Sequence, residues 1–475
     1  MINLTYPINY TYISGFRKDK AKDIHIDEEH NVYLTGITFS GDFVTSKKCN
    51  FGNKGNGQTS SISASKSLDS TNNGDAFLIK ISSTEDVDWV SYMRGDKVDE
   101  SRAISVDKKG NIYIAGYTYS PDFPVKKAFD EEISNGDAFI SKFDNKGELI
   151  WSTFLGGGSW NEGANDIVID ENEYVFVVGW TSSDDFPYAI NQYNGGCCDG
   201  YISKLDCNGR LIWSRYIGGE KEEEITGVQI DEKENVYLTG WTNSLQFPTQ
   251  VGYQMALKSI DQRDSFLSML DKKGEIIWST YFGGSSGDEA FDIAYENDGY
   301  IYITGRTRSH DLPKKGEFFM PIDVVKTDLF SPKKNYSNND AFIAKFNTKG
   351  DLIWNTYLGG ENHDESQGIC TDDRENIFIA GWTKSTRKLH DFKLIQKMEN
   401  IDGKKDSPYG IFLSKFRNDG FLYWTKLITL KSGTRGQCIS NDDQGNVYIS
   451  GYITLREADY ETEEDIFLFK YNDNQ

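Results

Sequence analysis

One block of sequence recurs seven times along the chain and limits the possible folds more than any other feature. It resembles Asn-Ile-Tyr-Ile-Thr-Gly and returns every 61 to 80 residues. A short Ile-x-Val-Asp run precedes it, and blocks that resemble Asp-Ala-Phe-Ile and Leu-Ile-Trp-Ser follow it. We call the four blocks A, B, C and D in chain order. The block-B glycines are Gly36, Gly116, Gly179, Gly240, Gly305, Gly381 and Gly451.

The four blocks have the character of short β-strands. Each is rich in β-branched and aromatic residues with alternating apolar positions, and turns containing Gly, Asn or Asp separate them. Four strands in a unit of this length are typical of a propeller blade. Because one blade cannot bury both faces of its sheet, seven blades must pack in a ring. The sequence therefore predicts an all-β, seven-bladed propeller with four antiparallel strands per blade.

The two ends of the chain predict how this ring closes. The last unit has blocks A, B and C but no block D, whereas residues 8–15 align with the block D of residues 150–157. The N-terminal strand is therefore expected to complete the last blade. Asn9 stands where the other six blades have Trp, which predicts that this blade is the softest. The expected blades, within one domain of 1–475, are 20–94, 101–157, 164–219, 225–284, 290–360, 367–430 and 435–475 plus 1–15.

Several motifs resemble a known repeat. The chain has Gly-x-Thr-x-Ser-x-Asp-Phe-Pro at 116–124 and 179–187, Asp-Ala-Phe from Asp75 and Asp137, and Tyr-Leu-Gly-Gly at 357–360. These motifs resemble the SBBP-type repeat of bacterial and archaeal seven-bladed β-propellers. The resemblance covers nearly the whole chain and implies the fold. It implies no catalytic residues, because the family has none in common, although many of its members look like surface or exported proteins.

Charge and targeting signals exclude some classes of partner. The formal net charge is −22, from 51 Lys and Arg against 73 Asp and Glu, which speaks against nucleic acid and anionic membranes. The N-terminus has no basic segment followed by an apolar one, so we expect a soluble protein, cytoplasmic or released by a non-classical route. Six cysteines are too few for a disulfide scaffold. Cys197, Cys198 and Cys207 match no zinc spacing and are expected to be inert thiols.

One face of the ring is predicted to carry the long loops. Antiparallel strands place the A–B and C–D turns on one face and the B–C and D–A connections on the other. The Asp-x-x-Gly-Asn turns of the first face are expected to be structural rather than calcium sites. The B–C loops are long, and long loops on a rigid scaffold usually carry function. Short helices are expected around 254–260 and 392–398, and a notch above the last blade between the loops of blades 6 and 1.

Aromatic residues mark the centre of this B–C loop face. Five of the seven residues that follow the block-B glycine are aromatic, and such a ring could stack on sugars or seat apolar side chains of a peptide. The alternative is that these residues wedge between blades. The predicted ligand-binding residues are Trp160, Trp180, Trp241, Trp382, Tyr117, Tyr452 and Arg306.

The D–A connections are acidic and should surround the axis on the same face. A crowd of carboxylates could bind calcium or a basic partner. The alternative is that these are solvated loop charges and strand caps. The weak candidates for a metal site are Glu100, Glu162, Glu223, Glu289 and Glu365, and no other cofactor is expected.

Catalytic motifs are scarce. The five histidines form no metal-hydrolase pattern, and the chain has neither a Gly-x-Ser-x-Gly elbow nor a phosphate-binding loop. The leading hypothesis is a non-catalytic binding or scaffold propeller that presents the B–C loop face to a protein or glycan. One alternative is a carbohydrate-active enzyme that uses carboxylates at the axial mouth. The other is a structural component of a larger assembly.

Overall fold

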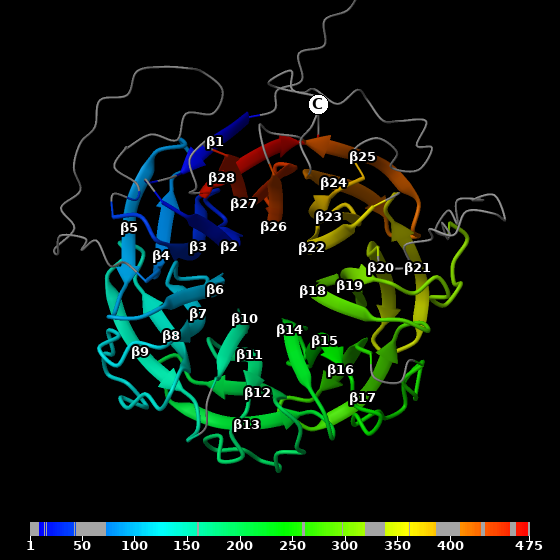
Figure 1. Cartoon of the computed structure of the whole chain (residues 1–475), viewed down its shortest axis with the longest axis horizontal. Coiled ribbons are helices and arrows are strands. Elements are labelled where there is room, and N and C mark those ends of the chain that lie inside the picture. Colours follow the sequence, from blue (N-terminus) through cyan, green and yellow to red (C-terminus); the bar gives the residue numbers. More distant parts are fainter. Residues whose placement is uncertain are drawn as a thin grey trace, which may run out of the picture.

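A computed structural model describes most of the chain, and in this part every regular element is a β-strand (Figure 1). No helix in this part is long and apolar enough to span a membrane. The described residues are 9–13, 15, 17–41, 43, 73–158, 161–258, 262–296, 298–318, 338–360, 362–385, 409–428, 433–456 and 462–473.

Seven four-stranded antiparallel sheets form a ring of blades, which confirms the predicted fold (Figure 1). In blades 1 to 6 the strands follow chain order from the axis outward. Blade 1 has β2 (Asp19–Ile26), β3 (Val32–Thr38), β4 (Asp75–Ile81) and β5 (Val87–Met93). Blade 2 has β6 (Asp99–Val106), β7 (Ile112–Thr118), β8 (Asp137–Phe143) and β9 (Leu149–Leu155). Blade 3 has β10 (Gly163–Ile169), β11 (Val175–Thr181), β12 (Asp199–Leu205) and β13 (Leu211–Ile217).

The other half of the ring repeats this order. Blade 4 has β14 (Glu223–Ile230), β15 (Val236–Thr242), β16 (Asp264–Leu270) and β17 (Ile276–Phe282). Blade 5 has β18 (Asp288–Glu296), β19 (Tyr300–Thr307), β20 (Asp340–Asn347) and β21 (Leu352–Leu358). Blade 6 has β22 (Asp364–Thr371), β23 (Asn376–Thr383), β24 (Gly410–Arg417) and β25 (Leu422–Ile428). Blade 7 has β26 (Thr434–Asn441), β27 (Asn446–Arg456), β28 (Thr462–Asn472) and β1 (Asn9–Ile13).

The N-terminal strand closes the ring as the sequence predicts. Strand β1 pairs antiparallel with β28, in register from Asn9 opposite Lys470 to Ile13 opposite Ile466. Figure 1 shows the two strands, from opposite ends of the chain, side by side in blade 7. Ile13 is buried in the apolar cluster between blades 7 and 1. The closure therefore joins the sheet and the core at the same place.

The core is divided among the junctions between blades. Seven buried apolar clusters are present, and each contains residues of two adjacent blades. Buried side chains on both faces of each middle strand explain the near-continuous apolar runs of blocks B and C. The blades thus depend on one another for burial, as expected of stacked repeats.

The B–C loops of several blades fold back over the outer strands. Single β-bridges join Lys126 to Ser152 in blade 2, Ala189 to Ser214 in blade 3 and Gln250 to Ser279 in blade 4. The helix expected around 254–260 is wrong for the described residues 254–258, which form no helix. Gln254 instead accepts a hydrogen bond at 2.9 Å from the Tyr281 amide of β17. Residues 392–398 and the loops that would wall the notch lie outside the described residues.

A bulge interrupts every innermost strand. The register with the second strand shifts in each blade, for example between Ala21 and Asp23 in blade 1, so one residue on β2 has no partner on β3. In an antiparallel pair such a bulge twists the strand and redirects its extra side chain. The seven bulged residues are Lys22, Arg102, Asn165, Thr226, Phe291, Gln367 and Gln437.

An aspartate follows the bulge in alternate blades and bridges two of them. Asp23 of blade 1 accepts hydrogen bonds from its own neighbour Ile24 (2.7 Å) and from Ile104 of blade 2 (2.8 Å). Asp166 joins blade 3 to blade 4, and Asp292 joins blade 5 to blade 6, with the same distances. The equivalent residues of blades 2, 4, 6 and 7 are Ala103, Gly227, Gly368 and Cys438.

Candidate functional site

The candidate site is a ring of side chains at the axial end of the B–C loop face. In every blade, one residue at or next to the start of the innermost strand lies directly opposite the residue that follows the block-B glycine. We call these seven pairs the mouth collar. The pairs are Lys20–Ile37, Glu100–Tyr117, Gly163–Trp180, Glu224–Trp241, Glu289–Arg306, Glu365–Trp382 and Arg435–Tyr452.

Close backbone approach explains the recurrent glycine beside the collar. A Cβ atom on Gly116 would lie 1.9 Å from the carbonyl oxygen of Glu100, and one on Gly36 would lie 2.0 Å from that of Lys20. Only glycine fits here, where the bulge draws the two inner strands together. The glycine therefore fixes the position of the collar residue that follows it.

The aromatic collar residues are packed against cations. Only 5% of Trp241 and 8% of Trp382 is exposed, whereas Tyr117, Trp180 and Tyr452 are half-buried. A cation lies over each ring at a distance that gives a favourable cation–π interaction. The distances to the ring centroids are 4.9 Å for Arg102 over both Tyr117 and Trp180, 3.5 Å for Arg263 over Trp241, 4.9 Å for Arg435 over Trp382 and 4.6 Å for Lys20 over Tyr452.

Arg306 takes the place of an aromatic residue in blade 5. Its guanidinium binds both oxygens of Glu289, at 2.9 and 2.8 Å, and its other nitrogen lies 3.1 Å from Glu365 of blade 6. The structure therefore brings six of the seven predicted ligand-binding residues into one collar. Trp160, the seventh, lies outside the described residues.

The predicted metal-site carboxylates separate into two groups. Glu100, Glu289 and Glu365 lie in the collar and are paired with cations. Glu100 is 3.1 Å from Lys22 and 3.0 Å from Arg102. These carboxylates are neutralised by neighbouring side chains, so they are structural partners within the collar.

Glu162 and Glu223 belong to the second group, which ties the inner strands together. Thr242 donates to Glu223 at 2.6 Å, and the Gly219 amide donates to its other oxygen at 2.8 Å. Glu162 accepts in the same way from Thr181 and Ser183. Burial raises the pKa of Glu162 to about 7. The same residue in the other blades is Asp19, Asp99, Asp288 and Asp364, and Thr434 in blade 7.

The structure brings together no metal-binding set. Within the described residues, no three His, Cys, Asp or Glu side chains are close enough to hold a metal ion. Cys197, Cys198, Cys207, Cys370 and Cys438 are free thiols. Calcium binding stays a prediction.

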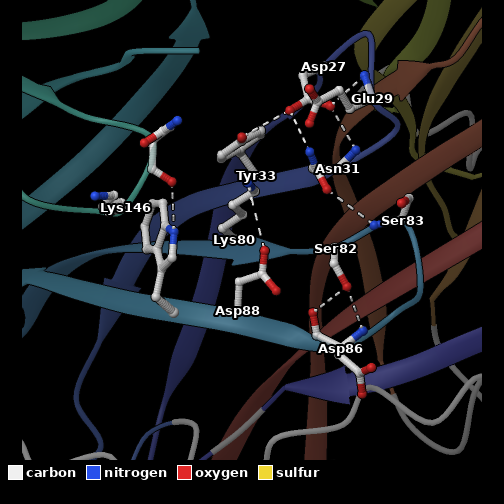
Figure 2. Close-up of polar contacts among 12 residues, drawn as sticks. Asp27, Glu29, Asn31, Tyr33, Lys80, Ser82, Ser83, Asp86, Asp88 and Lys146 are labelled. Atoms are coloured by element: carbon white, nitrogen blue, oxygen red, sulfur yellow. Dashed lines mark hydrogen bonds and ion pairs between the residues drawn. The ribbon is translucent and has the colours of Figure 1, made fainter.

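The Asp-x-x-Gly-Asn turns of the opposite face are closed by their own hydrogen bonds. Figure 2 shows the corresponding turn of blade 1, where His30 stands in place of the glycine and the Asp27 carboxylate accepts from the amides of Glu29 (3.0 Å) and Asn31 (2.8 Å). It also accepts from the Asn31 side chain at 2.8 Å and from the Tyr33 hydroxyl at 3.0 Å. The carboxylate oxygens are thus used within the turn, as the structural interpretation predicts.

Polar contacts link the collar from blade to blade around the whole ring. Several of these contacts come from the bulged residues, which sequence reasoning missed. An alignment of the repeats on the buried acids Asp19, Asp99 and Glu162 would have placed Lys22, Arg102 and Asn165 in one column, three residues later. Between blades 6 and 7 the contact is the stacking of Arg435 on Trp382. The other contacts are Lys22–Glu100 (3.1 Å), Arg102–Asn165 (2.8 Å), Asn165–Glu224 (2.8 Å), Arg263–Glu289 (3.6 Å), Arg306–Glu365 (3.1 Å) and Lys20–Glu464 (2.9 Å).

A family of repeats matches the chain at five places. The family is described as the SBBP beta-propeller repeat, and the matches cover 94–124, 150–187, 212–248, 277–313 and 353–387. Four of the five begin in the outer strand of one blade and end beyond the second strand of the next. The repeat therefore includes blocks A and B, which form the collar.

Two curated proteins resemble most of the chain. The regulatory protein FlaEY of Caulobacter vibrioides is 22% identical over 79% of this chain and 39% of its own length. An uncharacterised WD repeat-containing protein of Acanthamoeba polyphaga mimivirus is 22% identical over 77% of this chain and 31% of its own length. The chain thus spans about a third of the length of these relatives.

Solved structures resemble the chain at low identity. A protein of unknown function from Dyadobacter fermentans is 10% identical, with a TM-score of 0.42 and 98% of each chain covered. Sqt1 from Chaetomium thermophilum is 10% identical, with a TM-score of 0.44 and coverage of 98% and 99%. Similarity at this level carries no functional argument.

Proposed function

Because the chain is a seven-bladed propeller of SBBP beta-propeller repeats, we propose that it is a non-catalytic binding module whose partner is a protein. The partner would contact the B–C loop face at the mouth collar. The supporting observation is that a polar or cation–π contact at the collar joins each blade to the next around the ring. Side chains held in this way lose little further entropy on binding.

The composition of the collar favours a protein over a glycan. Arginine, tryptophan and tyrosine are the residues that most often dominate protein interfaces, and the collar is rich in all three. Sugar recognition by stacking would need an open aromatic face. Cations cover the rings of Trp241 and Trp382, which are also buried. We therefore assign the half-buried edges of Tyr117, Trp180 and Tyr452 to contacts with a protein.

No specific observation favours the carbohydrate-active alternative. Hydrolysis by two carboxyl groups requires a free carboxylate and a second one able to donate a proton to the substrate. Glu100, Glu289 and Glu365 are each bound to cations. Glu162 and Glu223 are buried and accept hydrogen bonds from neighbouring hydroxyls.

Site-specific photo-crosslinking tests this proposal. A benzophenone amino acid replaces Tyr117 in the collar or, as the control, Lys109 on the A–B turn face, and each variant is irradiated in extract of the source cells. We expect a discrete protein adduct from position 117 and none from position 109. Equal adducts from both faces, or an oligosaccharide adduct in place of a protein, would contradict the proposal.

A further inference from the structure

Blade 7 departs from the pattern of the other blades at the mouth. Six blades have a buried Asp or Glu at the start of the innermost strand, or directly before it in blade 3, but blade 7 has Thr434, followed by Arg435. The Thr434 hydroxyl is buried, and no hydrogen-bond partner for it is found in the part of the chain that the structure describes. This sector of the mouth has thus exchanged a carboxylate for a hydroxyl and a cation.

Two cations of this sector have no carboxylate partner among the residues that the structure describes. The Arg435 guanidinium lies 4.9 Å from the ring centres of both Trp382 and Tyr409, and it donates to the Tyr452 hydroxyl at 3.3 Å. The Lys384 ammonium lies 4.9 Å from the centre of the Tyr409 ring. Over the described residues neither cation forms an ion pair.

The other cations in or beside the mouth collar differ from these two, because a carboxylate already neutralises each of them. Arg102, Arg263 and Arg306 form ion pairs with glutamates at 3.0, 3.6 and 2.8 Å respectively. Lys20, on the far side of Tyr452, pairs with Glu464 at 2.9 Å. Lys384 and Arg435 therefore keep positive charge that no carboxylate of the described residues neutralises, and an incoming anion would meet this charge in their sector.

The surroundings of Tyr409 agree with this local charge. Burial works to raise the pKa of Tyr409, but hydrogen bonds and charge from Lys384 and Arg435 outweigh it and lower the pKa. By contrast, the pKa of Tyr117 in blade 2 is raised to about 12 by burial and by Glu100. The potential around Tyr409 is thus positive, within a chain whose net charge is −22.

We infer that Lys384 and Arg435, with the hydroxyls of Tyr409 and Tyr452, form a subsite for an acidic side chain of the protein partner. The inference rests on the proposed function and names the chemistry of the partner segment that occupies blades 6 and 7. Arginine offers five donors in a planar fork, and one nitrogen of Arg435 donates to the Tyr452 hydroxyl at 3.3 Å. Lysine adds a compact charge beside it.

A peptide carboxylate fits this subsite better than an acidic sugar. The guanidinium of Arg435 lies over the indole of Trp382, so the ring face that a pyranose would need is covered. A flexible Asp or Glu side chain needs only the edge of the fork and the ammonium. The expected ligand is therefore an acidic peptide segment recognised by charge.

The test measures binding of a fluorescent hexaglutamate peptide by anisotropy at low salt, with a hexaglutamine peptide as the neutral probe. The double variant Lys384→Gln with Arg435→Gln is compared with Lys108→Gln with Lys109→Gln, which makes the same charge change on the opposite face. We expect the first pair to weaken hexaglutamate binding by about tenfold or more. We expect the second pair to bind as the unaltered chain does.

Three outcomes would overturn the inference. These are equal weakening by both double variants, equal binding of hexaglutamine, and binding of a glucuronate oligosaccharide in preference to the peptide. If Arg435→Gln unfolds the chain, Lys384→Gln alone and Arg435→Lys are measured, and each must still weaken binding. Crosslinking from position 117 is repeated in the folded variants. An adduct that persists beside failed peptide binding rejects the subsite and leaves the proposed function standing.

Discussion

At the scale of single residues, a glycine and a tryptophan from adjacent blades depend on each other. The glycine of the C–D turn in blades 2 to 6 has a positive φ and lies against the block-D tryptophan of the preceding blade. A Cβ atom on Gly209 (φ 81°) would lie 2.9 Å from the Trp151 ring. In blade 1 the turn has Glu85 at φ 67°, and the strand that precedes it around the ring has Asn9 in place of Trp. Among blades 1 to 6, which have a C–D turn, the glycine is absent only in blade 1, where the preceding outer strand has no tryptophan.

The first prediction follows from this pair. Gly209→Ala should lower the free energy of unfolding by about 2 kcal/mol, because alanine at positive φ is strained and its methyl group meets the indole. Urea denaturation followed by tryptophan fluorescence measures the change. Glu85→Ala is the control, because that turn already holds a side chain at positive φ, and its stability should change little. Equal losses in the two variants would refute the dependence on Trp151.

The site was predictable at this scale only where residues recur. The aromatic residue after the block-B glycine recurs, so Tyr117, Trp180, Trp241, Trp382 and Tyr452 could be placed at the mouth. The cations that cover these rings come from different elements. The bulge places Arg102 in the collar, whereas Arg263 precedes an outer strand, so no single repeated position contains both. A bulge depends on local backbone geometry, which block A does not reveal in its apolar pattern.

At the scale of elements, the aspartates after the bulges hold neighbouring inner strands together. Each carboxylate accepts one amide from its own strand and one from the next blade. Asp166 does this for β10 and β14 through the amides of Ile167 and Val228. Burial raises the pKa of Asp23 to about 7 and that of Asp292 to about 6. The bridges therefore join blades in pairs 1–2, 3–4 and 5–6.

The second prediction removes one bridge. Asp166→Ala should lower the free energy of unfolding by about 1–3 kcal/mol, because the amides of Ile167 and Val228 lose their acceptor. Alanine is tolerated at this position in blade 2, where Ala103 occurs naturally, so the fold should persist. Asp184→Ala, at an exposed aspartate of the same blade, is the control. An unchanged urea midpoint for the Asp166 variant would show that the bridge contributes nothing.

At the scale of the whole molecule, buried carboxyl groups set the pH dependence of stability. Burial raises the pKa of Asp99 and Asp199 to about 7 and that of Asp264 to about 8. The folded chain therefore retains protons that the unfolded chain, with a carboxyl pKa near 4, releases. This contribution to stability is complete below the pKa of the unfolded chain and is lost as pH rises through the folded values.

The third prediction is that the protein melts at a lower temperature as pH rises from about 5.5 to 8. The sign follows because the folded state binds more protons than the unfolded state across this range. Repulsion within a chain of net charge −22 acts in the same direction. Circular dichroism at constant ionic strength measures the melting temperature. A melting temperature that rises with pH would contradict this account.

The fourth prediction concerns blade 7. It has Thr434 in place of the buried acid, Cys438 in place of a bridging aspartate, and Asn9 in place of the block-D tryptophan. Amides of β26 and β28 should therefore exchange with deuterium faster than those of β14 and β16 in blade 4. Hydrogen exchange resolved by mass spectrometry measures the difference. Uniform protection of the two blades would mean that β1 alone compensates for the three missing contacts.

The whole fold was predictable from the sequence because the same short sequence blocks recur along the chain. Seven copies of blocks A, B and C fix the number of blades. The absence of block D from the last copy fixes the closure by residues 9–13. The segment 254–258 was not predictable in this way, because each B–C loop is unique. The spacing of its apolar residues resembles that of a helix. The edge of β17 instead offers backbone amides and carbonyls as hydrogen-bond partners, and the Tyr281 amide donates to Gln254.

The alternation of aspartate with small residues around the axis has an arithmetic consequence. Two kinds of residue cannot alternate strictly around a closed ring of seven blades, because at one junction two neighbouring blades must have the same kind. In this ring that junction lies between blades 6 and 7, where Gly368 is followed by Cys438. The seventh blade, left over after the pairing, is also the blade that β1 and β28 close. The unpaired blade and the closure of the ring thus coincide.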